Sequence, residues 1–388
     1  MGKVKTHYNI DEIDSKGASI NIIFAMRSNG KSYQVKHKKG VIPAIKDTTR
    51  YIDPYYNKGH IIKEVQEKGG CFMLVRRWRE EISTALIEKY FDDVDVERIT
   101  EGEYNFITVY RNQIFFSNYD IKTNKVTKGK RIGYVVALST EQKYAGGSYL
   151  DVTDIIFEEF MSRTGYIGNH EPSKLMNLFS TVDRQRGYVK MWLVGNTITR
   201  ICPYLVEWDL LPMIKSMKKG EIKEKWIPTG EKDDEGRDIE VKIAFEWCDK
   251  NSGANYIIGE HKEMLNSGDW QAEAQPHLHK SLKDYKILYR VIFYYKEFKF
   301  LGEYLLDLET RECCWFIKPY EGEIKDNIIV FSDRIKASRY WQRDIYNPLI
   351  NNPKLVNIFR TFKENNIFYA SDLCGTDFKQ AIDFEIRK

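Results

Sequence analysis

Residues 20–32 read INIIFAMRSNGKS, and this stretch decides the fold expected for the 388-residue chain. The apolar run 20–25 predicts a buried strand, and the residues after Gly30 predict the start of a helix. Residues 25–32 match the phosphate-binding pattern G-x-x-x-x-G-K-[ST], except that Ala25 stands at the first glycine. Backbone N–H groups between such a strand and helix bind phosphate. We therefore expect a nucleotide site, although a chance Gly-Lys-Ser in a basic turn would give the same letters.

Each residue of this loop has an expected role. Gly30 allows the backbone to approach a phosphate, Lys31 would neutralise the β- and γ-phosphates, and Ser32 would ligate Mg²⁺. The predicted cofactors are therefore ATP and Mg²⁺. The expected nucleotide-binding residues are Arg27, Ser28, Asn29, Gly30, Lys31, Ser32, Tyr33 and Asn196.

A second apolar run, DIIFEE at 154–159, ends in two carboxylates. In nucleotide hydrolases, one acid in this place holds the metal and the next orients or deprotonates water. We assign Glu158 to the metal with Ser32, and Glu159 to the water. The usual first acid is aspartate, so Glu158 is a departure. The alternative is a buried strand with a solvated acidic end.

A third apolar run, 189–194, precedes Gly195 and Asn196. The Asn196 amide would sense the γ-phosphate, unless it only marks the boundary between a strand and a turn. Arg184 and Arg186 lie just before this run, and an arginine from a neighbouring subunit often offsets transition-state charge. Surface arginines are also commonly just solvated. The predicted catalytic residues are Glu159, Arg184 and Lys31.

Apolar runs alternate with helix-like segments, which predicts an α/β fold with parallel strands in the first half. Residues 215–242 are rich in charge and glycine, which favours a solvated linker. From residue 285 the sequence becomes aromatic and strand-like, and 340–363 has helical spacing. We expect a first domain over 1–212, a linker or lid over 213–279, and a smaller α/β domain over 280–388.

The composition excludes several classes of protein. Hydrophobic residues make up 42% of the chain, which excludes a mainly disordered protein. Sixty basic and 56 acidic residues leave a net charge of +4, so the chain is not a general polycation. No apolar run approaches the ~20 residues that a membrane span needs, so no membrane partner is expected. The six cysteines show no CxxC spacing, which favours free thiols.

Taken together, these segments resemble one family of phage proteins. The matching runs are NIIFAMRSNGKSY (21–33), FMLVRRWRE (72–80), LSTEQKY (138–144), DIIFEEF (154–160) and the stretch 175–210. Their order and spacing over about 18–212 resemble the DNA encapsidation proteins of podoviruses whose prohead carries a structural RNA. Beyond residue 245 the resemblance is confined to the region 285–307.

The resemblance implies an ATP-driven motor that moves double-stranded DNA into a prohead. Residues 1–212 would form a RecA/ASCE-type P-loop ATPase domain, and 280–388 an RNase H-like domain without nuclease activity. Expected partners are non-specifically bound DNA, the portal or connector, prohead RNA, and further copies in a pentameric ring. The expected location is the host cytoplasm, transiently at the portal vertex, and not the mature virion.

The resemblance also assigns trans-acting roles. The family's trans-acting arginine falls on Arg184, and two further basic positions fall on Arg79 and Lys143. Grip on DNA needs Lys and Arg contacts to phosphates, for which the basic loop 122–131 is the best candidate. The residues expected to act across the subunit interface or on DNA are Arg79, Lys143, Arg186, Lys122, Lys125, Lys128 and Lys130.

Three other functions remain open from the sequence. The first is a terminase large subunit with a live nuclease, for which Asp307 would be the first metal-binding acid. Its candidate companions are Glu309, Asp372, Asp377 and Asp383. The second is a nucleotide-binding scaffold without hydrolysis, and the third is a P-loop helicase. His277 and His279 lack a cluster of other ligands, so we expect them to be structural.

Overall fold

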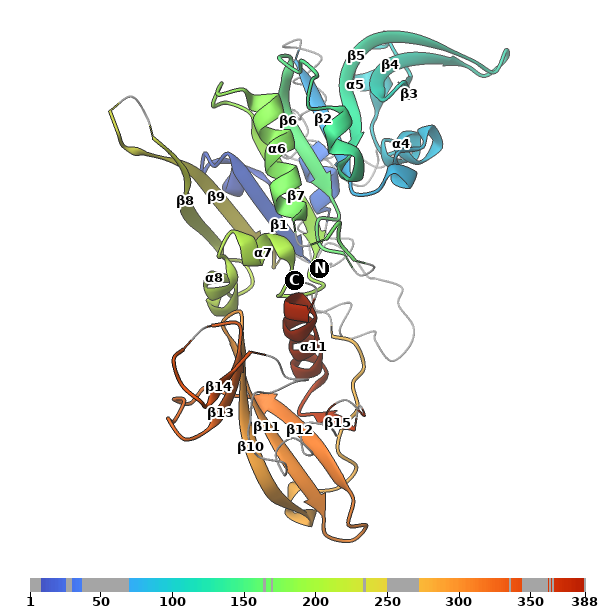
Figure 1. The fold of residues 1–388 in the computed structure, drawn as a ribbon. Coiled ribbons are helices and arrows are strands. Elements are labelled where there is room, and N and C mark those ends of the chain that lie inside the picture. The colour runs from blue at the N-terminus through green and yellow to red at the C-terminus, as the bar shows by residue number, and fades with distance from the viewer. Residues whose placement is uncertain are drawn as a thin grey trace, which may run out of the picture. The chain divides into compact units, whose positions relative to one another are not determined.

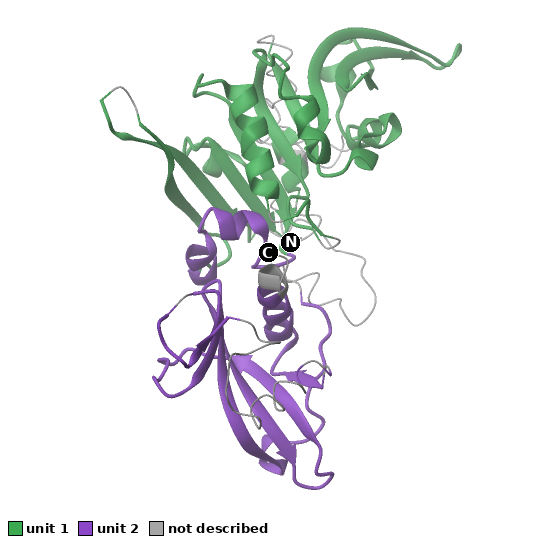
Figure 2. Ribbon diagram, viewed as in Figure 1, with its two compact units in different colours: residues 1–197, 217–269 green, residues 198–216, 270–388 purple. Residues whose placement is uncertain are grey.

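The computed structural model describes residues 8–25, 30–36, 70–162, 165–168, 170–232, 235–249, 272–334, 336–343, 362, 364 and 366–386. The chain divides into two compact units, coloured separately in Figure 2. The first unit comprises residues 1–197 and 217–269, and the second comprises residues 198–216 and 270–388. Each unit is built on its own sheet.

The first unit holds a nine-stranded sheet in the order β3-β4-β5-β2-β6-β7-β1-β9-β8. The six strands from β5 to β9 in this order are all parallel. An antiparallel hairpin extends each edge (Figure 1). The strands are β1 (Ile20–Ala25), β2 (Cys71–Arg76), β3 (Phe106–Tyr110), β4 (Gln113–Asp120), β5 (Lys125–Ala137), β6 (Val152–Glu158), β7 (Lys190–Asn196), β8 (Ile222–Lys232) and β9 (Asp238–Trp247).

Central strands of this sheet are buried along most of their length because helices and loops cover both faces. All six residues of β1 are buried, as are five of the seven in β7. Near-continuous apolar strands of this kind are characteristic of parallel sheets. The helices of this unit are α1 (Asp11–Asp14), α2 (Lys31–Lys36), α4 (Thr84–Tyr90), α5 (Val96–Ile99) and α6 (Glu171–Asp183), with 3₁₀ turns η1 (Arg79–Ile82) and η2 (Leu138–Lys143).

The structure differs from the expected linker over 213–279, because strands β8 and β9 lie inside that range. β9 pairs in parallel with β1, with Ile243 beside Ile20, and so extends the sheet of the first unit. The charge that suggested a linker lies on β8, an exposed edge strand, and on the outer half of β9. Residues 198–216 group with the second unit, so the compact units do not divide at residue 212.

The second unit holds a six-stranded sheet in the order β14-β13-β10-β11-β12-β15. The middle strands β10, β11 and β12 are antiparallel, while β13, β14 and β15 each run parallel to a neighbour. Its elements are β10 (Tyr285–Tyr295), β11 (Phe298–Asp307), β12 (Cys313–Pro319), β13 (Ile329–Ser332), β14 (Trp341–Gln342), β15 (Ile367–Tyr369), α7 (Pro203–Glu207), α8 (Leu211–Ser216), the turn η3 (Leu282–Asp284) and α11 (Asp372–Ile386).

Aromatic side chains form the core of this second unit. The Phe293 ring contacts the rings of Trp315, Phe331 and Phe378 at centroid distances of 5.0–6.5 Å. The aromatic run from residue 285 therefore forms strands that pack on α11, as its composition predicts. Of the helix expected at 340–363, most lies outside the described residues, and its start forms β14 instead.

Two expectations from composition concern the whole chain. All six cysteines are free thiols. Among the residues that the structure describes, none of the helices is long and apolar enough to cross a membrane.

Candidate nucleotide-binding site

The first cluster of predicted site residues forms where β1 and β7 end side by side. The two strands run parallel with Ala25 beside Asn196, so the loop after β1 starts next to the Asn196 side chain. Lys31 donates a hydrogen bond from Nζ to Oδ1 of Asn196 at 2.8 Å. Gly30 has a φ of +87°, a backbone conformation that favours glycine. The side chains of Lys31 and Asn196, both predicted to bind nucleotide, thus lie together.

The second cluster joins the start of α2 to the end of β6. Ser32 Oγ donates to Glu158 Oε2 at 2.9 Å, and the Tyr90 hydroxyl donates to Glu158 Oε1 at 2.9 Å. A hydroxyl beside a carboxylate is a fitting donor set for Mg²⁺, which takes one or two protein oxygens and completes its shell with phosphate oxygens and water. Ser32 and Glu158 therefore fit the metal role predicted for them.

Burial of the Glu158 carboxyl raises its pKa, which the hydrogen bonds from Tyr90 and Ser32 and the charges of Lys36 and Arg76 partly offset. Burial and the Glu158 charge raise the pKa of Tyr90 well above its usual value, so this phenol stays protonated. A protonated Tyr90 is a permanent hydrogen-bond donor to Glu158.

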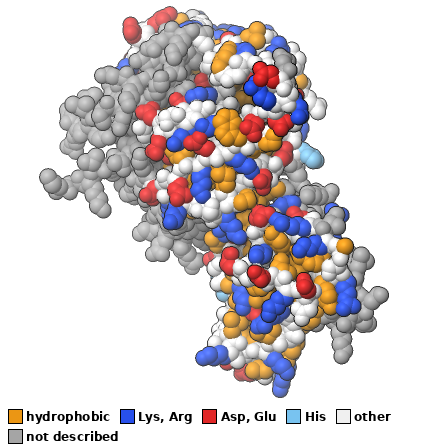
Figure 3. All heavy atoms as spheres, turned by 90° about the vertical axis from the view of Figure 1, so that its left-hand side faces the viewer, with side chains coloured by type: hydrophobic (Ala, Val, Ile, Leu, Met, Phe, Trp, Pro, Cys, Tyr) orange, Lys and Arg blue, Asp and Glu red, His pale blue; other side chains and the backbone are white. Residues whose placement is uncertain are grey.

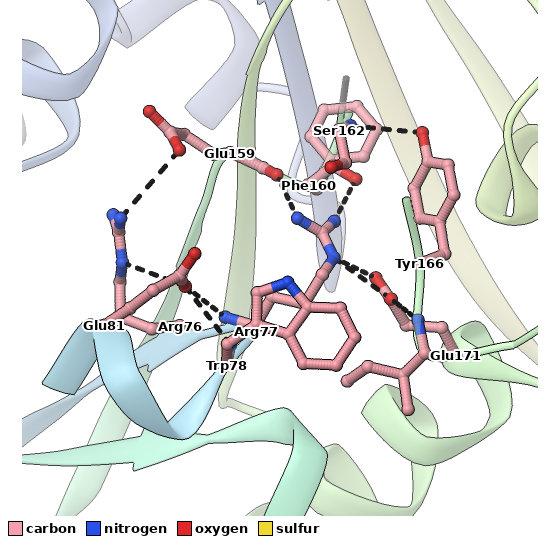
Figure 4. Close-up of polar contacts among 10 residues, drawn as sticks. Arg76, Arg77, Trp78, Glu81, Glu159, Phe160, Ser162, Tyr166 and Glu171 are labelled. Carbon is pink, nitrogen blue, oxygen red and sulfur yellow. Dashed lines mark hydrogen bonds and ion pairs between the residues drawn. The ribbon is translucent and has the colours of Figure 1, made fainter. Parts of the chain in front are cut away.

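Glu159 lies just past the end of β6 and turns away from the sheet. Its φ is +58°, and its side chain is 66% exposed. Arg76, the last residue of β2, comes within 3.9 Å of Glu159 Oε2 (Figure 4). Glu159 is therefore accessible for water and has a neighbouring positive charge.

A buried arginine holds the Glu159 turn in place. Arg77 Nη1 donates to the Glu159 carbonyl at 2.9 Å, and Nη2 donates to the Phe160 carbonyl at 2.6 Å. Arg77 Nε lies 3.0 Å from both carboxylate oxygens of Glu171, whose Oε2 also accepts from the Ile167 N–H at 2.7 Å. Figure 4 shows the guanidinium between these partners. The Arg77 and Glu171 side chains are 4% and 0% exposed, so the charges are paired away from water.

Residues 1–229 match the family described as "Podovirus DNA encapsidation protein (Gp16)". The chain belongs to the podovirus DNA encapsidation family. The match covers more than half of the chain and includes every residue of the two clusters.

Relatives of this encapsidation family cover different shares of the chain. The "DNA packaging protein" of Bacillus phage phi29 is 24% identical over 298 residues, which are 74% of this chain and 72% of the relative. The "DNA packaging protein" of Bacillus phage B103 is 32% identical over 166 residues, 41% of this chain and 45% of the relative. A chain of the bacteriophage Phi-29 viral genome packaging motor assembly covers 98% of this chain and 99% of its own length, at 20% identity with a TM-score of 0.50. The similarity to the motor-assembly chain shows a shared fold with mixed α/β sheets.

Several site residues of this encapsidation protein were not predicted from the sequence. Tyr90, Arg76 and Arg77 contact predicted residues but come from the end of α4, the end of β2 and the residue that follows β2. Lys36 is buried: its Nζ donates to the Tyr90 carbonyl at 2.7 Å, pairs with Asp93 and lies 4.4 Å from the Tyr90 ring centroid. The Arg76-Arg77 pair at a strand end, already part of the family resemblance, was the one available signal.

The two arginines before β7 have different surroundings. Arg184 is the left-handed C-cap of α6, and its side chain is exposed and donates to the Gly147 carbonyl at 2.8 Å. Arg186 bonds the carbonyls of Val182 at 2.7 Å and Val152 at 3.2 Å, and pairs with Leu150 and Tyr188. Arg184 thus lies at the surface, whereas Arg186 joins the segment before β6 to the end of α6.

The other basic candidates lie on the surface of the first unit. Arg79 and Lys143 are exposed. Lys122, Lys125 and Lys128 are exposed on the β4–β5 hairpin and Lys130 is partly exposed, and the Lys128 Nζ lies 3.6 Å from the Tyr110 ring centroid. On the face drawn in Figure 3, Lys and Arg side chains are interspersed with Asp and Glu, in keeping with the small net charge.

Four of the five acids considered for a nuclease have another partner. Asp307 pairs with Lys280 at 3.0 Å, and Glu309 pairs with the same lysine at 2.7 Å. Asp372 accepts from the Gln275 N–H and contacts His277, and Asp377 pairs with Arg200. Among the described residues there is no group of three His, Cys, Asp or Glu side chains that could hold a metal. His277 is structural, as expected, since its ring also bonds the Tyr369 carbonyl.

Some predicted residues cannot be placed in the site. Arg27, Ser28 and Asn29 lie outside the described residues, as do the side chains of Tyr33 and Asp383.

Proposed function

We propose that this chain is the ATP-hydrolysing motor subunit that moves double-stranded DNA through a portal into a prohead. The convergence of Lys31 with Asn196 and of Ser32 with Glu158, at one edge of a parallel sheet, carries this proposal. Family membership and the packaging role named for the phi29 relative support the DNA substrate.

ATP with Mg²⁺ fits the residues present. Lys31 would neutralise phosphate charge, and Ser32 with Glu158 would supply oxygen ligands to the metal. Glu159 would orient or deprotonate the attacking water, and the Asn196 amide would sense the terminal phosphate. When bound, the metal neutralises charge that develops on the phosphate oxygens.

The strand order supports a RecA/ASCE-type ATPase. Strand β7 lies between β1, which leads into the phosphate loop, and β6, which carries the acidic pair. Because β7 ends at Asn196, this order supports a position of its amide between the loop and the carboxylates, which is the arrangement of this class of ATPase.

We further propose a pentameric ring in which Arg184 completes the site of the next subunit, with Arg79 and Lys143 near that interface. The phi29 relative belongs to a packaging motor assembly, which supports partners in a motor complex. We propose that these partners are the portal, prohead RNA and further copies of this chain. The exposed lysines of the β4–β5 hairpin are the proposed DNA contacts. The protein would act in the host cytoplasm at the portal vertex and be absent from the mature virion.

The second unit is proposed to be an RNase H-like domain that serves docking rather than cutting. Three antiparallel strands, β10, β11 and β12, are extended beyond β10 by the parallel strands β13 and β14, which is the strand arrangement of that fold. Pairing of Asp307 with Lys280 supports the loss of metal binding.

The deciding experiment measures ATP hydrolysis per protomer against protein concentration, with proheads present and absent. Hydrolysis should rise with concentration and disappear in Glu159→Gln, which retains ATP binding. DNA protected inside proheads should follow the same dependence. ATP binding without hydrolysis under every condition would instead identify a scaffold.

A further inference from the structure

The second compact unit begins directly after the nucleotide site. Strand β7 ends at Asn196, the partner of Lys31, and the Thr197 N–H still bonds the Ala25 carbonyl at 3.1 Å. The second unit starts at Ile198 and keeps the chain through Ser216 (Figure 2). A residue expected to sense phosphate is therefore two positions from the start of the other unit.

The first residues of that unit are fixed to helix α11. Arg200 Nη2 donates to Asp377 Oδ2, and the Thr199 hydroxyl donates to Gln380 Oε1. Asp377 and Gln380 are three positions apart on one helix, a spacing that puts them on the same face. The Arg200 guanidinium also lies 5.3 Å from the Phe298 ring centroid. The chain leaving the nucleotide site is thus held by polar bonds to a helix near the C-terminus.

The Arg200–Asp377 ion pair is suited to transmit movement. The Asp377 side chain is 3% exposed, and breaking a buried pair leaves an uncompensated charge. Between Thr197, bonded to β1, and Thr199, bonded to α11, only Ile198 lies free of these anchors. Two residue steps span at most about 7 Å, so the connection has little slack.

We propose that Arg200 and Asp377 couple ATP hydrolysis to DNA movement, by passing displacement of Asn196 to the second unit through their ion pair. They are positioning residues, because neither belongs to the predicted nucleotide site. This inference rests on the proposed function, and it assigns the coupling to the short segment 196–200.

The crossing at Ser216–Met217 is a weaker candidate, and the crossing at 269–270 lies outside the described residues. Near the Ser216–Met217 crossing, an exposed hydrogen bond joins Lys215 Nζ to the Glu297 carbonyl at 3.2 Å. The nearest predicted nucleotide-site residue before that crossing, Asn196, lies 20 positions before Ser216 but only two before Ile198. The segment beside Asn196 is therefore the more direct route.

The test measures base pairs packaged per ATP hydrolysed by motors assembled on proheads. In Asp377→Asn and Arg200→Gln, we expect hydrolysis within about twofold of wild type and a fall of about tenfold in DNA packaged per ATP. Asp377→Glu, which keeps the charge, should retain coupling.

Asp333→Asn is the matched control, because it removes the Lys296–Asp333 pair, whose side chains are 14% and 15% exposed in the same unit. The proposal is overturned if Asp377→Asn packages as many base pairs per ATP as wild type. It is also overturned if Asp333→Asn lowers this ratio as much as Asp377→Asn does. If Asp377→Asn does not fold, Thr199→Val removes the neighbouring bond and is judged by the same ratio. If the wild-type protein itself does not hydrolyse ATP, the proposed function is refuted instead.

Discussion

The Tyr90 hydroxyl donates a 2.9 Å hydrogen bond to Oε1 of Glu158, while Ser32 donates to the other oxygen. Both carboxylate oxygens are thus held before a metal binds. Glutamate has one more rotatable bond than the aspartate usual at this position. Tyr90 limits that additional freedom, which would allow the longer acid to take the proposed role of metal ligand.

Replacing Tyr90 with phenylalanine should weaken Mg²⁺-dependent ATP binding. The change removes one hydrogen bond to a charged acceptor, worth about 1.5–3 kcal/mol, or roughly 10- to 100-fold in affinity. Titration of ATP with and without Mg²⁺ measures the effect. Tyr119→Phe, which removes an exposed bond to Asn124, is the control. Equal loss of affinity without Mg²⁺ would contradict a role through Glu158.

Acidification should weaken Mg²⁺-ATP binding through Glu158. Burial raises the pKa of this carboxyl above its ordinary 4.5, and the metal binds only the deprotonated form. Affinity should therefore fall as the pH drops toward the raised pKa.

Folding stability should depend on pH in the opposite direction. The folded state holds this proton to a higher pH than the unfolded chain, so the contribution of Glu158 to stability declines as pH rises from 4.5 through the folded-state pKa. Binding measured between about pH 5 and 8, with Glu158→Gln as control, tests the first effect, because ATP's own phosphates titrate equally in both proteins. A parallel pH profile in Glu158→Gln would refute it.

Arg184→Ala and Arg186→Ala should fail in different ways. Arg184→Ala should fold normally and lose hydrolysis, because its proposed role is in the next subunit. Arg186→Ala should lose about 1–3 kcal/mol of folding free energy, since carbonyls at Val152 and Val182 lose their donor.

Mixing two inactive variants tests whether Arg184 acts in the next subunit. Arg184→Ala mixed equally with Glu159→Gln should regain hydrolysis at about a quarter of the interfaces, if the variants assemble at random. No recovery, with mixed rings formed, would mean that Arg184 acts within its own subunit.

The sequence predicted the centre of the site because local patterns mark it. A strand followed by Gly-Lys-Ser, a strand ending in two acids and a strand ending in Gly-Asn can each be recognised alone, and parallel pairing brings their ends together. Tyr90 could not be predicted, because its contact with Glu158 joins residues 68 positions apart. Nothing in the helix TALIEKY marks its tyrosine as different from any other core aromatic residue.

The expected linker over 213–279 was wrong for the same reason. Strand β8 is an exposed edge strand, and its charged side chains mask the alternation that would predict a strand. The buried half of β9, residues 243–247, is only five residues long. Its place beside β1 depends on tertiary pairing, which no local pattern encodes.

Gly195→Ala should destabilise the site without removing any functional group. A Cβ at Gly195 would lie 2.8 Å from Cε1 of Phe160, a ring that is fully buried. The ring or strand must shift, at a cost of about 1–3 kcal/mol. Chemical denaturation measures this loss, and Gly146→Ala, where a Cβ meets nothing within 4 Å, is the control. Equal stability of the two variants would contradict the packing argument.

Glu171→Gln should destabilise the chain more than any surface charge change, because it leaves the buried Arg77 guanidinium without its carboxylate. Breaking such a pair costs about 3–5 kcal/mol. Asp151→Asn is the matched control, since the side chains of the Arg131–Asp151 pair are 40% and 30% exposed and breaking this pair should cost about 0–1 kcal/mol.

Because Arg77 also holds the Glu159 and Phe160 carbonyls, Glu171→Gln should lower hydrolysis even where the protein stays folded. Denaturation midpoints and hydrolysis rates, measured below the unfolding range, separate the two effects. Full activity in folded Glu171→Gln would show that the turn at Glu159 keeps its geometry without this pair.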